Sequence, residues 1–366
     1  MSSNYSVIIL CKTLLKGGAE KQALILSKLL TENKVNITLI AWCADKIDPS
    51  NHNFIVVNSI KHIGLCGNPI SKLLRLFEII KAENTNILLS YLSLANLVAG
   101  IVKLFKGRVI TIGGIRAEKL PYHKFVFEKL IHNFINDATV CNSFSAKKIF
   151  VKQGFNPDKM LVIQNAIHVP PLKKNNIPRD EIIVISVSRF IKLKDHKTAL
   201  FSFKKVLEKT HSEKLRYYFI GYGPMEPDIR MLVNRLNLRN EVKILINPPN
   251  IAEILRSCDI YLSTSLNEGL SNSIMEAMVA GLPIIATDVG DNRFLIQDSY
   301  NGFIVPPRDI SLIAKKLEIL ISSEKTRHEF GVNSHQIMKS KFKEEKLLEN
   351  YVDLFSKFSE PAEVQN

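Results

Sequence analysis

The chain has 366 residues, of which 46% are hydrophobic and 23% are charged, and its formal net charge is +14. This composition excludes an intrinsically disordered chain, a collagen-like repeat and a coiled coil. At roughly 150 residues per domain, the length indicates two domains, each large enough for its own hydrophobic core.

The positive charge is concentrated in the first half. Residues 1–170 contain 21 Lys+Arg and 10 Asp+Glu, a net charge of +11, whereas residues 171–366 carry a net charge of only +3. Such an excess indicates an anionic partner, which is a nucleic acid, an anionic membrane surface or a phosphate-bearing substrate. Solvated charge on helix faces is the alternative explanation.

The cysteines and the apolar stretches indicate a cytoplasmic protein. Five scattered cysteines without a CxxC spacing favour a reducing compartment over a disulfide framework or a thiolate zinc site; they are Cys11, Cys43, Cys66, Cys141 and Cys258. The N-terminus lacks a secretory pattern. The longest internal apolar stretch, residues 92–104, is too short to span a bilayer and contains Asn96 and Lys103.

Short apolar runs alternate with longer amphipathic stretches through the first half. The predicted strands are Ser6–Leu10, Asn36–Ala41, Phe54–Val57, Ile87–Ser90, Val109–Thr111, Ala138–Cys141 and Met160–Ile163. The predicted helices are Glu20–Leu30, Pro69–Ala82, Leu94–Phe105, Lys124–Phe134 and Ser143–Gln153. This alternation predicts βαβ units around a parallel sheet.

A polar segment with three prolines, residues 168–181, reads as an interdomain linker before a second alternating series. The predicted strands of that series are Ile182–Ser188, Arg216–Ile220, Val242–Ile246, Ile260–Ser263, Pro283–Thr287 and Gly302–Val305. The tail carries apolar residues at helical spacing. We therefore expect an N-terminal domain 1–170, a second domain 171–340 and a tail helix 341–366. Two doubly wound, Rossmann-like domains facing each other would bind ligands in the cleft between them.

Three motifs at predicted strand ends suit phosphate or a flat ligand, although each alone fits an ordinary loop. Gly17 and Gly18 precede a helix whose N-terminus offers free N–H groups. Arg189 and Lys194 follow the first strand of the second domain, where both can face one diphosphate. The segment Gly221-Tyr222-Gly223-Pro224 is either a tight turn or a surface for a nucleobase.

The strongest motif runs from Ser265 to Met278. Glu268 lies in a loop, Gly269 allows an unusual backbone there, and Ser271 is a predicted N-cap for a helix carrying Glu276. The N–H groups near Leu270 suit a phosphate, and the two carboxylates beside it suit hydroxyl groups. A ligand with a central phosphate and hydroxyls on both sides is a nucleoside diphosphate sugar.

Together these motifs resemble the retaining glycosyltransferases of family four, which have the GT-B fold. The resemblance rests on Gly-Gly-x-Glu near the start, Ser-Arg-Phe with Lys194, Gly-Tyr-Gly-Pro, Glu268-x7-Glu276 and Gly-Leu-Pro. It runs from Gly17 to the tail, which in such folds crosses back to the first domain.

The resemblance implies a role for each residue. Arg189 and Lys194 would bind the donor diphosphate and stabilise the leaving group. Glu268 would contact donor hydroxyls, and Glu276 the ribose. The backbone N–H groups of Gly269, Leu270 and Ser271 would face the sugar and phosphates. Gly17 and Gly18 would approach the diphosphate. No metal or other cofactor is required.

The first domain departs from the family. Many members carry a histidine after the fourth strand, where this sequence reads Ser90-Tyr91-Leu92-Ser93. Arg116 and Glu118, after the next strand, could face acceptor or donor, so the catalytic partner from this domain stays open. Asn165-Ala166 stands where the family often has Asn-Gly.

The resulting hypothesis is a retaining transferase. It moves a hexose or N-acetylhexosamine from a UDP-linked donor to a glycan or lipid-diphosphate-linked glycan in polysaccharide biosynthesis, peripherally at the inner face of a membrane. A sugar-nucleotide epimerase of the same fold is the alternative. A nucleic-acid-binding module is disfavoured because no recognisable nucleic-acid motif occurs. A nicotinamide oxidoreductase is disfavoured because the G-x-G-x-x-G fingerprint is missing.

Overall fold

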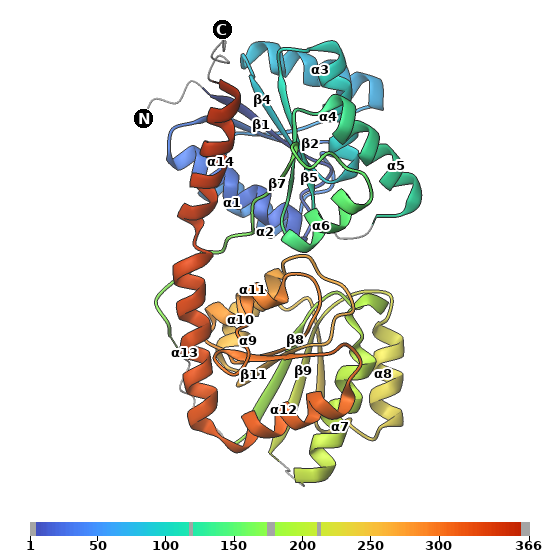
Figure 1. The fold of residues 1–366 in the computed structure, drawn as a ribbon, viewed down its shortest axis with the longest axis vertical. Helices are drawn as coiled ribbons and strands as arrows, with labels where there is room; N and C mark the ends of the chain where they lie inside the picture. The colour runs from blue at the N-terminus through green and yellow to red at the C-terminus, as the bar shows by residue number, and fades with distance from the viewer. Residues whose placement is uncertain (1–4, 117–119, 174–179, 211–213, 360–366) are drawn as a thin grey trace. The chain divides into compact units, whose positions relative to one another are not determined.

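In the computed structural model, residues 5–116, 120–173, 180–210 and 214–359 are described (Figure 1). The chain forms two compact units. Unit 1 contains Met1–Ala166 and Glu344–Asn366, and unit 2 contains Ile167–Lys343. The sequence-based division at 170/171 and 340/341 differs from these boundaries by a few residues.

Unit 1 is built on a parallel sheet of seven strands in the order β3-β2-β1-β4-β5-β6-β7. The strands are β1 (Ser6–Cys11), β2 (Asn36–Ala41), β3 (His62–Gly64), β4 (Ile87–Tyr91), β5 (Ile110–Ile115), β6 (Ala138–Cys141) and β7 (Met160–Val162). The helices are α1 (Gly18–Glu32), α2 (Pro49–Val57), α3 (Pro69–Ala82), α4 (Ser93–Phe105), α5 (Tyr122–Leu130), α6 (Phe144–Lys152) and α14 (Glu344–Ser359), with a π-helical turn, η1 (Ile131–Ile135). Strands β1 and β4 are buried along their whole length, as expected for a sheet covered on both faces.

The predicted strand Phe54–Val57 is wrong, because these residues form the last turn of α2. The Asp48 side chain accepts a hydrogen bond of 2.9 Å from the Ser50 N–H, and Pro49 occupies the first turn, so the local sequence starts a helix. The β-branched Val57 is 71% exposed on that helix. Strand β3, which the sequence analysis missed, takes the edge position instead.

Unit 2 is built on a parallel sheet of six strands in the order β10-β9-β8-β11-β12-β13. The strands are β8 (Ile182–Val187), β9 (Leu215–Gly221), β10 (Val242–Ile246), β11 (Ile260–Ser263), β12 (Ile284–Thr287) and β13 (Gly302–Val305). The helices are α7 (His196–Thr210), α8 (Glu226–Arg235), α9 (Ile251–Arg256), α10 (Asn272–Val279), α11 (Asn292–Leu295), α12 (Ile310–Ser322) and α13 (Glu324–Lys341).

Both sheets reverse their strand order at one point, between β1 and β4 in unit 1 and between β8 and β11 in unit 2. In doubly wound sheets, ligands bind beyond the carboxyl ends of the strands at such a switch point. The predicted α/β class with two Rossmann-like units is therefore confirmed, and the switch points locate where each unit can hold a ligand.

The C-terminal helix α14 completes the core of unit 1. Its Leu347, Tyr351, Leu354 and Phe355 are buried with residues of α1 and β1. In the described part of the chain, every helix is too short or too polar to cross a membrane.

Candidate functional site

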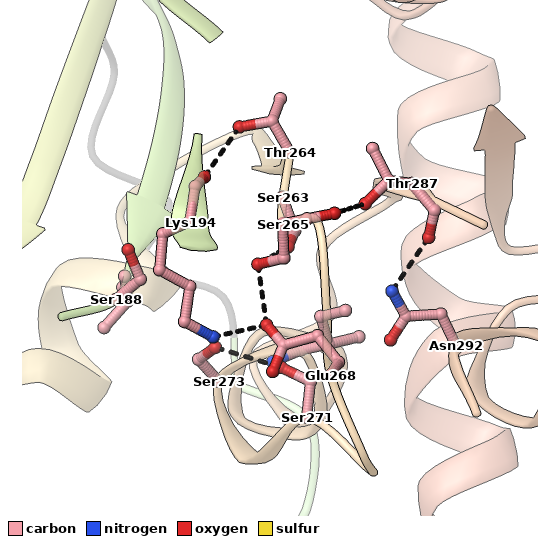
Figure 2. Close-up of polar contacts among 12 residues, drawn as sticks. Ser188, Lys194, Ser263, Thr264, Ser265, Glu268, Ser271, Ser273, Thr287 and Asn292 are labelled. Atoms are coloured by element: carbon pink, nitrogen blue, oxygen red, sulfur yellow. Dashed lines mark hydrogen bonds and ion pairs between the residues drawn. The ribbon is translucent and has the colours of Figure 1, made fainter. Parts of the chain in front are cut away.

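The centre of the site in unit 2 is an ion pair between Lys194 and Glu268 (Figure 2). Lys194 ends a short 3-10 turn that follows β8, and Glu268 lies in the loop that follows β11. The two side chains are only 15% and 12% exposed. The sequence predicted both residues, and the structure brings them together at the switch point of the sheet.

Three contacts hold the Glu268 loop. Ser265 Oγ donates a hydrogen bond of 2.7 Å to Glu268 Oε1, and the Gly269 carbonyl accepts one of 3.0 Å from the Asp291 N–H. Gly290 has a φ of +56°, and a Cβ atom there would lie 2.0 Å from the Glu268 carbonyl oxygen. Glycine is therefore required at 290 for this close approach.

The turn that carries Lys194 is hydrogen-bonded to the segment that leads into the same loop. Thr264 Oγ1 shares its single hydrogen between the carbonyl oxygens of Lys194 and Asp195, at 3.1 and 2.9 Å. The Leu266 N–H donates to the Leu193 carbonyl at 2.8 Å. Because these bonds join the segments after β8 and β11, the positions of the cation and the carboxylate are coupled through the backbone.

A second chain of hydrogen bonds supports the loop from the next strand. Thr287 Oγ1 at the end of β12 donates to the Ser265 carbonyl at 2.5 Å, and Asn292 Nδ2 donates to the Thr287 carbonyl at 2.9 Å. Figure 2 shows both hydrogen bonds. Thr287 and Asn292 are fully buried. Three neighbouring strands thus contribute to holding one loop.

The predicted N-cap Ser271 begins α10, and its Oγ accepts a long hydrogen bond of 3.5 Å from the Ile274 N–H. Glu276 lies on this helix and is half-buried. Burial raises the pKa of the Tyr261 hydroxyl, and the charges of Glu268 and Glu276 raise it further. Both predicted carboxylates therefore lie near Tyr261, beside the helix N-terminus that suits an anion.

His196 lies beneath Lys194 as a neutral, buried imidazole. Its Nε2 is 2.9 Å from Ser188 Oγ, and its ring packs at 5.2 Å from Phe190 and 5.7 Å from Phe219, between ring centroids. Burial, assisted by the charge of Lys194, lowers its pKa to about 4. The imidazole is therefore a packing and hydrogen-bonding element at neutral pH.

The glycines of the Gly-Tyr-Gly-Pro motif permit two loops to meet. A Cβ atom on Gly221 would lie 1.8 Å from the Ser188 carbonyl oxygen, and one on Gly223 would lie 2.5 Å from that of Phe190. The Phe190 N–H donates to the Tyr222 carbonyl at 2.7 Å. These glycines thereby set the path of the segment that presents Arg189, whose side chain is exposed.

In unit 1, Gly17 is the N-cap of α1 and Gly18 is its first residue. A Cβ atom on Gly17 would lie 2.1 Å from Glu20 Oε2, so the chain's own carboxylate lies over this helix N-terminus. A phosphate bound there would meet this negative charge.

Arg116 follows β5 in unit 1 and is held on three sides. Its Nη2 donates to Tyr351 Oη at 3.0 Å, its Nη1 donates to Asn165 Oδ1 at 3.2 Å, and its guanidinium lies 4.7 Å from the centroid of the Tyr91 ring.

Glu118 lies outside the described residues. Within the described ranges, no group of three His, Cys, Asp or Glu side chains is placed to hold a metal ion.

No role was predicted for the hydroxyl residues that position the ion pair. Thr264 and Ser265 follow β11 directly, and with Ser263 they form a run of three hydroxyl side chains at the carboxyl end of a predicted strand. This run of hydroxyl residues is the feature of the sequence from which their role could have been predicted. Nothing in the sequence indicates that Thr287 and Asn292 reach the same loop, because that contact depends on how neighbouring strands pair.

Comparison with known proteins shows which family the chain resembles. Residues 172–336 match the family model described as "Glycosyl transferases group 1". The UDP-Gal:alpha-D-GlcNAc-diphosphoundecaprenol alpha-1,3-galactosyltransferase of Escherichia coli is 22% identical over 374 residues, covering 93% of this chain and 94% of that enzyme. The N-acetyl-alpha-D-glucosaminyl L-malate synthase of Bacillus anthracis is 27% identical over 183 residues, and the match spans 50% of this chain and about half (47%) of that enzyme.

Among solved structures, Anabaena HepE in complex with UDP and glucose has a TM-score of 0.85 at 17% identity, covering 96% of this chain and 100% of that one. The predicted resemblance is thus confirmed: residues 172–336 of unit 2 match the group 1 glycosyltransferase model, and the chain has the two-domain GT-B fold.

Proposed function

We propose that the protein is a retaining glycosyltransferase that moves a hexose or N-acetylhexosamine from a UDP-linked donor to a glycan or lipid-linked glycan acceptor. The observation that carries the proposal is the Lys194–Glu268 pair at the switch point of unit 2, inside the segment that matches the family. The name of the Escherichia coli relative includes both a UDP-sugar and a diphosphate-linked lipid.

In this proposal Lys194 and Glu268 separate when the donor binds. A diphosphate carries more negative charge than one carboxylate, so it competes for the Lys194 ammonium and frees Glu268 to accept hydrogen bonds from sugar hydroxyls. Arg189 binds the same diphosphate, and the two cations stabilise the charge that develops on the leaving group.

The remaining donor contacts come from the loop before α10, from α10 itself and from unit 1. The N–H groups of Gly269, Leu270 and Ser271 face the sugar and phosphates, and Glu276 binds the ribose. Gly17 and Gly18 approach the diphosphate, which displaces the Glu20 carboxylate from this helix N-terminus, and Arg116 with Glu118 serves the acceptor side. The proposed reaction uses no metal, and the protein works in the cytoplasm at the inner face of a membrane.

The experiment is incubation with a panel of nucleotide sugars, read as released nucleotide and as a shift of the melting temperature. We expect one or more UDP-sugars to be hydrolysed slowly and to raise the melting temperature, with chelator leaving both unchanged. Retention is read from the anomeric configuration of the product by NMR. If no nucleotide sugar is consumed and none shifts the melting curve, the proposal is wrong. Isomerised donor without transfer would indicate the epimerase instead.

A further inference from the structure

Helix α5 and the turn η1 carry apolar side chains on the outside of unit 1. The exposed fractions are 82% for Tyr122, 59% for Phe127, 49% for Leu130 and 78% for Phe134. A helix on a protein surface normally buries such residues and exposes polar ones. Exposed apolar residues at this density mark an interaction site.

The buried face of the same segment is polar and fixed by specific partners. Both oxygens of the Glu128 carboxylate accept hydrogen bonds from Asn96 Nδ2, at 2.9 and 3.1 Å, and burial raises the pKa of this carboxyl. The two ring nitrogens of His132 lie 2.8 Å from Thr139 Oγ1 and 2.9 Å from the Asn156 carbonyl. The segment cannot rotate to hide its apolar face without leaving these buried polar groups unpaired.

Helix α4 lies beside α5 and η1 (Figure 1). Its exposed apolar residues extend the apolar surface. It packs on η1 where Gly100 faces Ile131, since a Cβ atom there would lie 3.4 Å from Ile131 Cγ2. Beyond this contact α4 exposes Leu104, which is 69% accessible. We call the exposed apolar residues of these elements the α4–α5 patch; it comprises Leu97, Leu104, Phe105, Tyr122, Val126, Phe127, Leu130 and Phe134.

The charge around the α4–α5 patch is positive. Lys106 and Arg108 are exposed just after α4, and Lys124 is exposed on α5. The described residues 93–116 and 120–137 contain two carboxylates: Glu128 is buried, and Asp137 is 26% exposed and pairs with Lys103 at 2.8 Å. An apolar surface bordered by cations, with no unpaired exposed carboxylate in these ranges, is complementary to anionic lipid headgroups above acyl chains.

We propose that the α4–α5 patch docks unit 1 onto an anionic phospholipid bilayer, with its aromatic side chains entering the headgroup region and its cations binding lipid phosphates. The inference rests on the proposed function in one respect: docking would give the enzyme access to a lipid-linked acceptor. Its physical basis is the outward apolar face and the charge that borders it, and it can be measured without any donor.

The test is co-sedimentation of the full chain with vesicles of phosphatidylcholine alone or mixed with phosphatidylglycerol. We expect binding to the mixed vesicles that weakens in high salt and falls about tenfold or more in F127S/F134S. K106E/R108E should also weaken it. The matched control is V56S/V57S, which changes two exposed valines of α2 and should bind like the parent chain.

Folding of each variant is checked by its melting curve, and donor binding by the UDP-sugar-induced melting shift in vesicle-free solution. Vesicle binding with no donor response would leave the patch in place and overturn only the proposed function. The docking proposal is overturned if phosphatidylglycerol does not increase vesicle binding by the parent chain. It is equally overturned if F127S/F134S binds the mixed vesicles as well as the parent chain does. It is also overturned if the patch pairs two copies, so that the double variant converts a dimer to a monomer without altering vesicle binding.

Discussion

The Lys194–Glu268 pair is nearly buried, and Ser265 holds its carboxylate. In the proposed donor site, Lys194 and Ser265 hold the Glu268 carboxylate in position until the donor diphosphate takes its place beside Lys194. The contribution of Glu268 to activity should therefore exceed its contribution to stability.

We expect Glu268→Gln to lower the turnover of UDP-sugar by about a hundredfold or more, because the amide retains the shape but loses the charge. Its oxygen still accepts from Ser265, so the melting temperature should change little. The matched control is Glu253→Gln, an exposed carboxylate on α9 of the same unit, which should leave turnover unchanged. Unchanged turnover in Glu268→Gln would contradict the assigned role.

His196 makes stability depend on pH. Its pKa is about 4 in the folded protein against an ordinary value of 6.5, so the unfolded chain binds the proton more readily. The stabilisation is present above pH 6.5 and is lost progressively as the pH falls towards 4, by roughly 3 kcal/mol in total. We expect His196→Asn to flatten this part of the curve for unit 2, measured by hydrogen exchange between pH 7 and 4. NMR titration of the imidazole gives the pKa directly, and a value near 6.5 would refute the prediction.

At the scale of elements, the site is a set of loops after β8, β11 and β12 that are bonded to one another. Thr264 is the central connection, since one hydroxyl serves the carbonyls of Lys194 and Asp195. It touches no proposed substrate atom and acts as a positioning residue.

Thr264→Val should therefore lower activity through the position of Lys194. The substitution keeps the volume and leaves two carbonyls without their donor, at a cost of about 1–3 kcal/mol. We expect kcat to fall at least tenfold, with a smaller change in the donor KM. Thr31→Val in α1 removes one hydroxyl bond to the Ser27 carbonyl and is the matched control, which should leave kcat unchanged. An equal loss in both variants would indicate a general structural effect.

Helices and strands were predicted best where the spacing of hydrophobic residues agreed with the capping and turn residues at their ends. Helix α3 and the strands β2, β6, β10, β11 and β13 have the predicted bounds because strong turn signals flank them. Phe54–Val57 was misassigned because β-branched propensity was weighed above the cap at Asp48 and Pro49. The short β3 has too few residues to show a period.

At the scale of the whole molecule, the charge asymmetry depends on where the tail belongs. The sequence places +11 on residues 1–170, but α14 and the residues after it join unit 1 and carry two Lys against six Asp+Glu. Grouped by compact unit, each unit has a net charge of +7. The local distribution around the α4–α5 patch, rather than the half-chain total, is therefore the electrostatic argument for a membrane.

Helix α14 should be needed for unit 1 and not for unit 2. Phe355 is fully buried in the unit 1 core, so Phe355→Ala should cost about 3–5 kcal/mol there. Hydrogen exchange should accelerate in β1 and β4 and stay unchanged in β8 and β11. Lys357→Ala, an exposed position on the same helix, is the control. Equal acceleration in both sheets would show that the units unfold together.

The sequence alone determined the α/β class and the two units, and it predicts most of the proposed donor residues, because hydrophobic period, caps and glycine positions are local properties. That Lys194 and Glu268 share one ligand is implied only by the family resemblance, since 74 positions separate these residues in the sequence. Tertiary structure decided the supports of that pair, the role of Gly221 and Gly223 in loop contact, and the outward apolar face of α5. Each of these depends on which strands are neighbours and which helix face meets them, and that information lies in packing between distant segments rather than in any local pattern.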